Sequence, residues 1–195
     1  MEFKKLSEVA DIHSGLVLGR KEADASDRET HLYKQLNLRS ISENGSIDIA
    51  LLDDFLSAEA INPQFITKVN DVIMRLFAPL CPVLITTDFT DLVVPSQLAI
   101  IRTDGRFITP EFVCIYLSQK SVMNEIVADG DLSMRSIRIG ALSDVKIPML
   151  PKKRQEEVAL FTRAHMNRKK LYLDMLHQYD IQTEAALRMI IEREQ

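Results

Sequence analysis

The C-terminal segment constrains this chain most, because residues 152–195 contain neither glycine nor proline. Leu, Ala, Met, Glu, Lys, Arg and Gln dominate the segment, and these residues favour the helical conformation. Pro148 and Pro151 stand just before it, and Pro151 can open a helix because its φ is already fixed. We therefore predict one helix from about residue 152 to about residue 193, with a length of about 60 Å.

A helix of this length exceeds the span of a domain of about 150 residues, so its apolar surface needs a partner. The apolar residues follow the 3-4 spacing of a coiled-coil seam, interrupted by His165, Arg168 and Gln182. A helix that lies along its own domain is the alternative, and we favour an exposed antiparallel or dimeric helix pair. The residues expected to contact the partner helix are Val158, Phe161, Tyr172, Met175, Tyr179, Ala186 and Met189.

Residues 1–150 differ from the C-terminal segment in their sequence pattern, because short apolar clusters alternate there with Gly, Pro, Asn and Asp. We predict an α+β fold, in which a mixed, β-rich domain with short helices at 1–150 precedes the helical arm at 151–195. No repeating βαβ unit is expected. The sequence predicts helices at 3–12, 110–117 and 122–127, strands at 33–41, 47–52, 71–77, 83–87, 97–102 and 145–147, and polar loops at 16–30 and 129–138.

Charge and composition narrow the possible functions. The formal net charge of −4 divides into −6 for residues 1–150 and +2 for residues 151–195, which argues mildly against a free-standing, non-specific nucleic-acid binder. No apolar run approaches the roughly 18 residues of a membrane span, and the N-terminus lacks a secretory signal. The 2 cysteines lie far apart, outside any metal-binding spacing, which fits a cytoplasmic protein without disulfides.

Patterns that carry catalysis are absent from the sequence. It contains no GxGxxG, GxxxxGK[ST] or GxSxG motif, and its 4 histidines are scattered. NPQF at residues 62–65 resembles the motif of amino-methyltransferases, and DVK at 144–146 resembles half of a nuclease metal motif. A turn and the solvent side of a strand explain these fragments more simply. We expect no catalytic residue, no metal and no cofactor.

Several stretches, taken in order, resemble one protein family. They are KLSEVADIHSG at 5–15, NDVIMRLF at 70–77, PEFVCIYLS at 110–118 and LSDVKIPMLP at 142–151, with Gln155 and Glu156 shortly after. Together with the long helix after the proline-rich join, they resemble a DNA-sequence specificity (S) subunit of a type I restriction-modification system. The match corresponds to one target-recognition domain and one conserved helical spacer. The family usually has Gly-Asp where this chain has Asn70-Asp71.

The resemblance implies a non-catalytic subunit that binds double-stranded DNA. It also implies a scaffold for methyltransferase (M) subunits, which use S-adenosylmethionine, and for restriction endonuclease (R) subunits. Family members usually carry two recognition domains and two helices, so one of each implies a half-subunit acting as a homodimer on inverted half-sites. A truncated remnant, or a member whose other half is a separate chain, are the alternatives.

Donor chemistry selects candidate DNA-binding residues. Arginine can bond the O6/N7 edge of guanine bidentately, and lysine or threonine can contact phosphates or base edges. A solvated surface charge or an internal ion pair is the competing interpretation of each basic residue. A positive patch on one face would favour DNA binding over the alternative function, a protein-interaction head dimerised by a helical stalk. The candidates are Arg20, Lys21, Arg28, Thr86, Thr87, Arg135 and Arg138.

Overall fold

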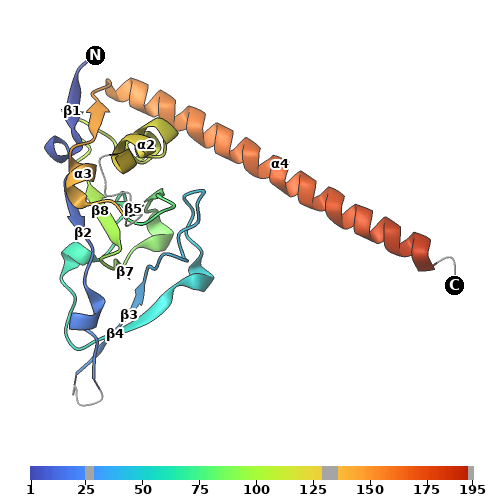
Figure 1. The fold of residues 1–195 in the computed structure, drawn as a ribbon, viewed down its shortest axis with the longest axis horizontal. Helices are drawn as coiled ribbons and strands as arrows, with labels where there is room; N and C mark the ends of the chain where they lie inside the picture. The colour runs from blue at the N-terminus through green and yellow to red at the C-terminus, as the bar shows by residue number, and fades with distance from the viewer. Residues whose placement is uncertain (25–28, 129–135, 193–195) are drawn as a thin grey trace. The chain divides into compact units, whose positions relative to one another are not determined.

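The computed structural model describes residues 1–24, 29–128 and 136–192 (Figure 1). Its contacts divide the chain into two compact units, Met1–Gln155 and Glu156–Gln195. The first unit combines strands with short helices, and a long helix ends the chain, so the predicted α+β class is confirmed. The strands are β1 (Phe3–Lys5), β2 (Asp11–Ser14), β3 (His31–Gln35), β4 (Asp53–Ser57), β5 (Val72–Arg75), β6 (Pro82–Leu84), β7 (Leu92–Val93), β8 (Leu98–Arg102) and β9 (Lys146–Pro148). The helices are α1 (Pro110–Leu117), α2 (Lys120–Ala128), α3 (Ile139–Ser143) and α4 (Lys152–Glu192), with 3-10 turns η1 (Leu6–Glu8), η2 (Leu18–Arg20), η3 (Ile49–Leu51), η4 (Pro63–Phe65) and η5 (Thr87–Phe89).

The strands described in the first unit form three sheets. An antiparallel sheet has the order β2-β8-β5-β6, a smaller sheet has the order β4-β3-β7, and β1 pairs with β9. Phe3 lies opposite Pro148 in the β1-β9 pair, so this pairing joins the beginning of the first unit to its end. The fold therefore depends on contacts between segments that are far apart in the sequence.

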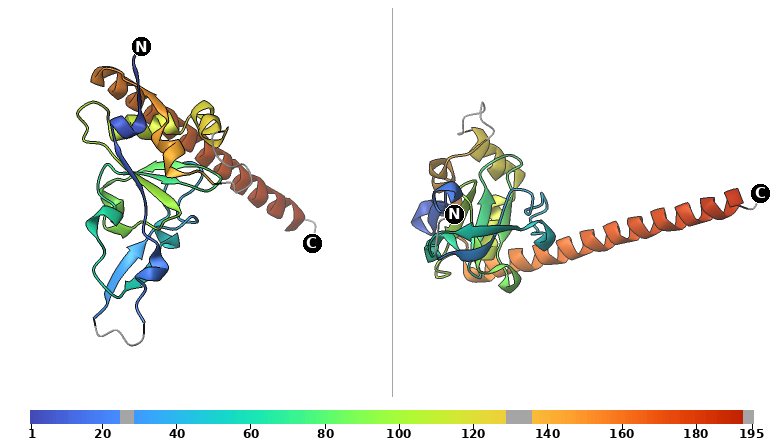
Figure 2. Two further views of the ribbon diagram at one scale, coloured as in Figure 1. Left: turned by 60° about the vertical axis from the view of Figure 1, so that its left-hand side comes forward. Right: turned by 90° about the horizontal axis from the view of Figure 1, so that it is seen from below.

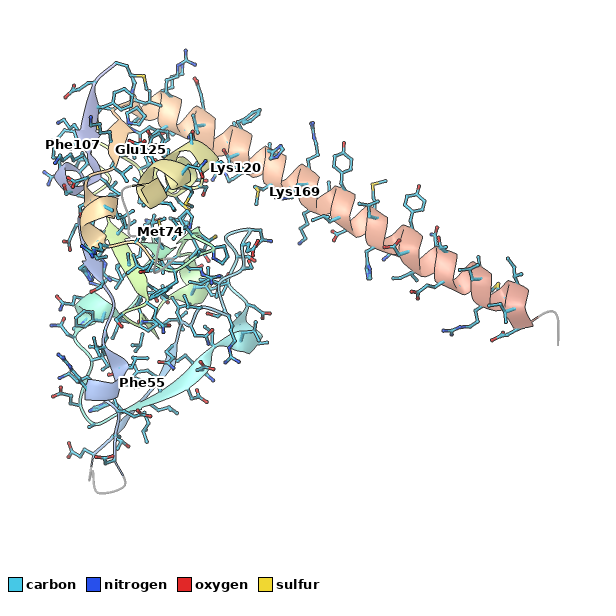
Figure 3. The ribbon with its side chains drawn as sticks, viewed as in Figure 1. Phe55, Met74, Phe107, Lys120, Glu125 and Lys169 are labelled. Atoms are coloured by element: carbon cyan, nitrogen blue, oxygen red, sulfur yellow. The ribbon has the colours of Figure 1, made fainter. Side chains whose placement is uncertain are left out.

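One apolar cluster joins the two larger sheets. Ile73 of β5 and Ile100 of β8 lie opposite each other and are fully buried, and Leu92 of β7 belongs to the same cluster. Met74, labelled in Figure 3, is also fully buried. Because burial of a large aliphatic side chain is worth about 1.5–3 kcal/mol, this cluster holds the sheets together. Helix α1 packs against β5 and β6.

Predictions based on local signals are confirmed most closely. Helix α1 begins at Pro110, and the Thr109 hydroxyl caps it by accepting from the Phe112 N–H at 3.3 Å. The strands predicted at 71–77, 83–87, 97–102 and 145–147 correspond to β5, β6, β8 and β9. Asn62 caps η4 by accepting from the Gln64 N–H at 3.0 Å, which confirms the interpretation of NPQF as a turn.

Two predictions near the N-terminus are wrong. The helix predicted at 3–12 is the strand β1, the single turn η1 and the strand β2. Leu6 is fully buried in this turn, and its N–H donates to the Val145 carbonyl at 2.8 Å. Within the strand predicted at 47–52, residues 49–51 form the turn η3, and the pairing strand β4 begins at Asp53, beyond it.

Helix α4 is continuous over 41 residues, which corresponds to about 60 Å (Figure 2). Its seam carries large apolar side chains that are exposed in the single chain, among them Phe161 at 74%, Tyr172 at 60% and Met189 at 66%. Met175, Tyr179 and Ala186 are also exposed, and Val158 is half-buried. Among the described helices, none combines the length and apolarity that a membrane span requires.

Candidate nucleic-acid interface

Some basic residues of the first unit form ion pairs with carboxylates, and others have no carboxylate partner among the described residues. The Arg102 guanidinium binds the Asp71 carboxylate through Nε at 2.8 Å and Nη2 at 2.9 Å. It also donates to the Ile66 carbonyl at 2.7 Å, so the bonds of this arginine stabilise the fold. Arg39 pairs with Asp53 and Arg106 with Asp104, both at exposed positions. Arginines with such partners are less available to a DNA phosphate or base.

Two of the predicted candidates lie beside η2. Arg20 is exposed, and no carboxylate of the described residues lies within ion-pair distance of it. Lys21 forms an ion pair with Glu59, which offsets its charge. Arg28 and Arg135 lie outside the described residues, so their predicted roles stay predictions.

Arg138 is exposed and occupies the N-cap position of α3 without a side-chain capping bond. Helix α3 contacts η1 and β2, whereas η2 follows the other end of β2. Figure 1 shows α3 and the dark blue η2 segment at opposite ends of that strand. The structure therefore does not bring Arg20 and Arg138 into one patch.

Thr86 and Thr87 lie at the start of η5, after β6, and both are exposed. The Thr86 hydroxyl makes no capping bond, and the Thr87 carbonyl accepts from the Thr90 hydroxyl at 3.4 Å. Both threonines are exposed residues, as a contact with a DNA base or phosphate requires. Their location at η5 separates them along the chain from η2 and α3.

Arg75 is a basic residue that the sequence did not single out. It is half-buried at the end of β5, and its Nη1 donates to the Ile41 carbonyl at 3.3 Å. Its Nε is buried and has no hydrogen-bond partner among the described residues, which also place no carboxylate within ion-pair distance. Sequence alone shows only an arginine at the end of a strand, because pairing depends on tertiary contacts.

The segment after β5 lies beside the segment before α3. The exposed Phe77 forms an antiparallel bridge with Ser136, and the Ile137 N–H donates to the Leu76 carbonyl at 2.8 Å. Arg138 follows directly, so Arg75, Phe77 and Arg138 belong to two adjoining segments. We call these three residues the β5-end surface.

Burial affects the two cysteines of the first unit in the same direction. Burial raises the pKa of the Cys114 thiol to about 12, and it also raises the pKa of Cys81. Neither thiol is therefore activated as a nucleophile. Within the described parts of the chain, no group of three or more His, Cys, Asp or Glu side chains is placed to hold a metal ion.

Comparison with solved structures identifies the fold. A chain from a structural study of complex assembly and conformational transition in a type I R-M system matches with a TM-score of 0.65 and 17% identity. The HsdS subunit from Thermoanaerobacter tengcongensis matches with a TM-score of 0.64 and 16% identity, and the type I restriction-modification S subunit from M. genitalium with 0.51 and 15%. The matches cover 86%, 87% and 86% of this chain in that order.

The chain thus has an α+β fold that ends in a long helix, which is the fold of these type I restriction-modification specificity subunits, so the fold that the sequence resemblance implied is confirmed. It spans only 42%, 43% and 39% of the three matched chains. The sequence itself matches no family model and no curated protein.

Proposed function

We propose that this chain is a DNA-recognition and scaffold subunit of a type I restriction-modification complex. The observation that carries this proposal is the specificity-subunit fold, which extends over 86% of the chain. In this role the first unit binds one half of a split site in double-stranded DNA. The chain is non-catalytic and directs M subunits, which methylate with S-adenosylmethionine, and R subunits, which cleave. A cytoplasmic location follows from this function.

The charge of the first unit is compatible with this role. A net charge of −6 over residues 1–150 opposes non-specific attraction to phosphates. In an assembled complex, M subunits can supply most of the phosphate contacts, while a few side chains of the first unit read base edges. We therefore expect weak DNA binding by the isolated chain and specific binding by the assembly.

We further propose that α4 pairs with the same helix of a second copy. The exposed apolar seam supports pairing, because such a surface is unfavourable in water. The charge of α4 supports an antiparallel arrangement: residues 152–170 carry seven basic and two acidic residues, whereas 171–192 carry one basic and four acidic residues. An antiparallel pair places each basic half beside an acidic half.

This symmetry predicts the form of the DNA site. Two identical first units related by a two-fold axis bind inverted half-sites, because the symmetry of the protein is mirrored in its operator. The paired helices, each about 60 Å long, hold the first units of the two copies at a fixed separation. The site should therefore consist of two short half-sites separated by a spacer of constant length.

Methylation mapping tests the proposed function. DNA is sequenced for methylated bases from cells that express the neighbouring M subunit with and without this chain. We expect one methylated motif that requires the chain. Absence of chain-dependent methylation, with both proteins present and associated, would contradict the proposal and favour the protein-interaction module.

A further inference from the structure

We infer that the β5-end surface, formed by Arg75, Phe77 and Arg138, contacts double-stranded DNA. The inference rests on the proposed function and names residues through which the first unit would carry it out. Arg75 is its central member, and neither Arg75 nor Phe77 was a candidate from the sequence.

The first argument is the unused hydrogen-bonding capacity of Arg75. Half-burial restricts the side chain, and the bond from Nη1 to the Ile41 carbonyl orients the guanidinium. The Nε is buried and cannot reach a ligand from solvent, so the capacity that counts is that of the terminal nitrogens, of which only Nη1 has a hydrogen-bond partner among the described residues. Arg39, Arg102 and Arg106 show the ordinary arrangement, since each has a carboxylate partner. An oriented arginine without an anionic partner suits a ligand that brings hydrogen-bond acceptors.

The second argument is the chemistry of the two residues near Arg75, namely Phe77 and Arg138. Phe77, two residues further on, is 39% exposed although it is a large apolar side chain. The bridge from Phe77 to Ser136 brings the segment that carries Arg138 alongside, and Arg138 has no ion pair with a described residue. Two unpaired cations with an exposed aromatic ring match the chemistry of a nucleic-acid surface. Phosphates and guanine edges bind arginine, and an aromatic ring can contact a thymine methyl or wedge at a base step.

The variants follow from this chemistry. Arg75→Lys keeps the charge and most of the buried stem but removes the planar fork that bonds a base or phosphate bidentately. Phe77→Ala changes an exposed ring, so the fold should tolerate it. Arg106→Ala is the matched control, because Arg106 is exposed and already paired with Asp104. Thermal melting and co-purification of the M subunit establish that each variant folds and assembles.

The assay combines methylation mapping with DNA binding by the purified complex over a range of salt concentrations. If Arg75 or Phe77 reads a base, we expect discrimination at one position of the motif to fall by roughly 5- to 150-fold. If the contact is to phosphate, we expect the same motif, weaker binding and a salt slope reduced by about 1. Both results support the inference, and Arg106→Ala should leave motif and affinity unchanged.

Two results would overturn it. Unchanged motif, affinity and salt slope in folded Arg75→Lys and Phe77→Ala would remove this surface from DNA contact. Loss of the M subunit from the purified complex, with the fold retained, would assign the surface to a protein partner instead. Failure of the wild-type chain to direct methylation is a separate outcome, which contradicts the proposed function itself.

Discussion

Replacing Gln155 tests whether a single buried side chain stabilises the last residues of the first unit, where α4 begins. The side chain is fully buried. Its Nε2 donates to the Phe107 carbonyl at 2.9 Å and to the Leu150 carbonyl at 2.8 Å, and its Oε1 accepts from the Thr109 N–H at 2.7 Å. The Thr109 segment leads directly into α1, so one amide holds three backbone segments together.

The expected decrease in the free energy of unfolding follows from the loss of these three hydrogen bonds. Gln155→Leu retains much of the volume but leaves the part-buried Thr109 N–H and the Phe107 and Leu150 carbonyls without this partner. An unsatisfied buried polar group costs about 1–3 kcal/mol, and relaxation makes such costs less than additive, so we expect a loss of about 3 kcal/mol. For a unit of this size, that corresponds to a decrease in Tm of roughly 6–12 °C.

Thermal unfolding followed by circular dichroism or calorimetry measures the decrease. Gln64→Ala is the control, because Gln64 is exposed and surface substitutions usually change stability by less than about 0.5 kcal/mol. A Tm for Gln155→Leu within about 2 °C of the wild type would refute the reasoning, because the three bonds would then contribute little to the fold.

The remaining predictions concern a close backbone approach and the helix seam. A Cβ on Gly15 would lie 2.3 Å from two backbone carbonyl oxygens, so Gly15→Ala should destabilise the first unit by more than about 2 kcal/mol in thermal unfolding. Gly19→Ala meets no atom within 4 Å and should be nearly neutral; equal Tm values for the two variants would contradict this account. In light scattering at micromolar concentration, the wild type should have twice the chain mass, and Tyr172→Glu combined with Tyr179→Glu should be monomeric. His177→Glu, on the opposite side of the helix, should remain dimeric, and a monomeric wild type would contradict pairing.

Local signals in the sequence predicted the elements that local interactions specify. Pro110 and Glu111 favour a helix start, and α1 begins there. The absence of Gly and Pro after Pro151 predicted α4 because helix propensity accumulates over a long segment. The order of four short motifs identified the specificity-subunit fold, which comparison with solved structures confirms.

Non-local pairing explains what the sequence could not show. The apolar spacing of residues 3–12 suits a helix, but β1 pairs with β9 and β2 with β8, and these pairings override the local preference. The same reason applies to the site. Whether Lys21 meets Glu59, and whether Arg75 meets any carboxylate, depends on segments that only the fold brings together.

The sequence of the methylated motif is the most direct test of the central claim, that two copies of this chain direct methylation through two symmetric DNA contacts. It is read from the DNA of cells that express this chain with its M subunit and no other specificity subunit. We predict two inverted half-sites with a spacer of constant length, both lost when the chain is omitted. A motif without a spacer, or one that persists without this chain, would contradict the account.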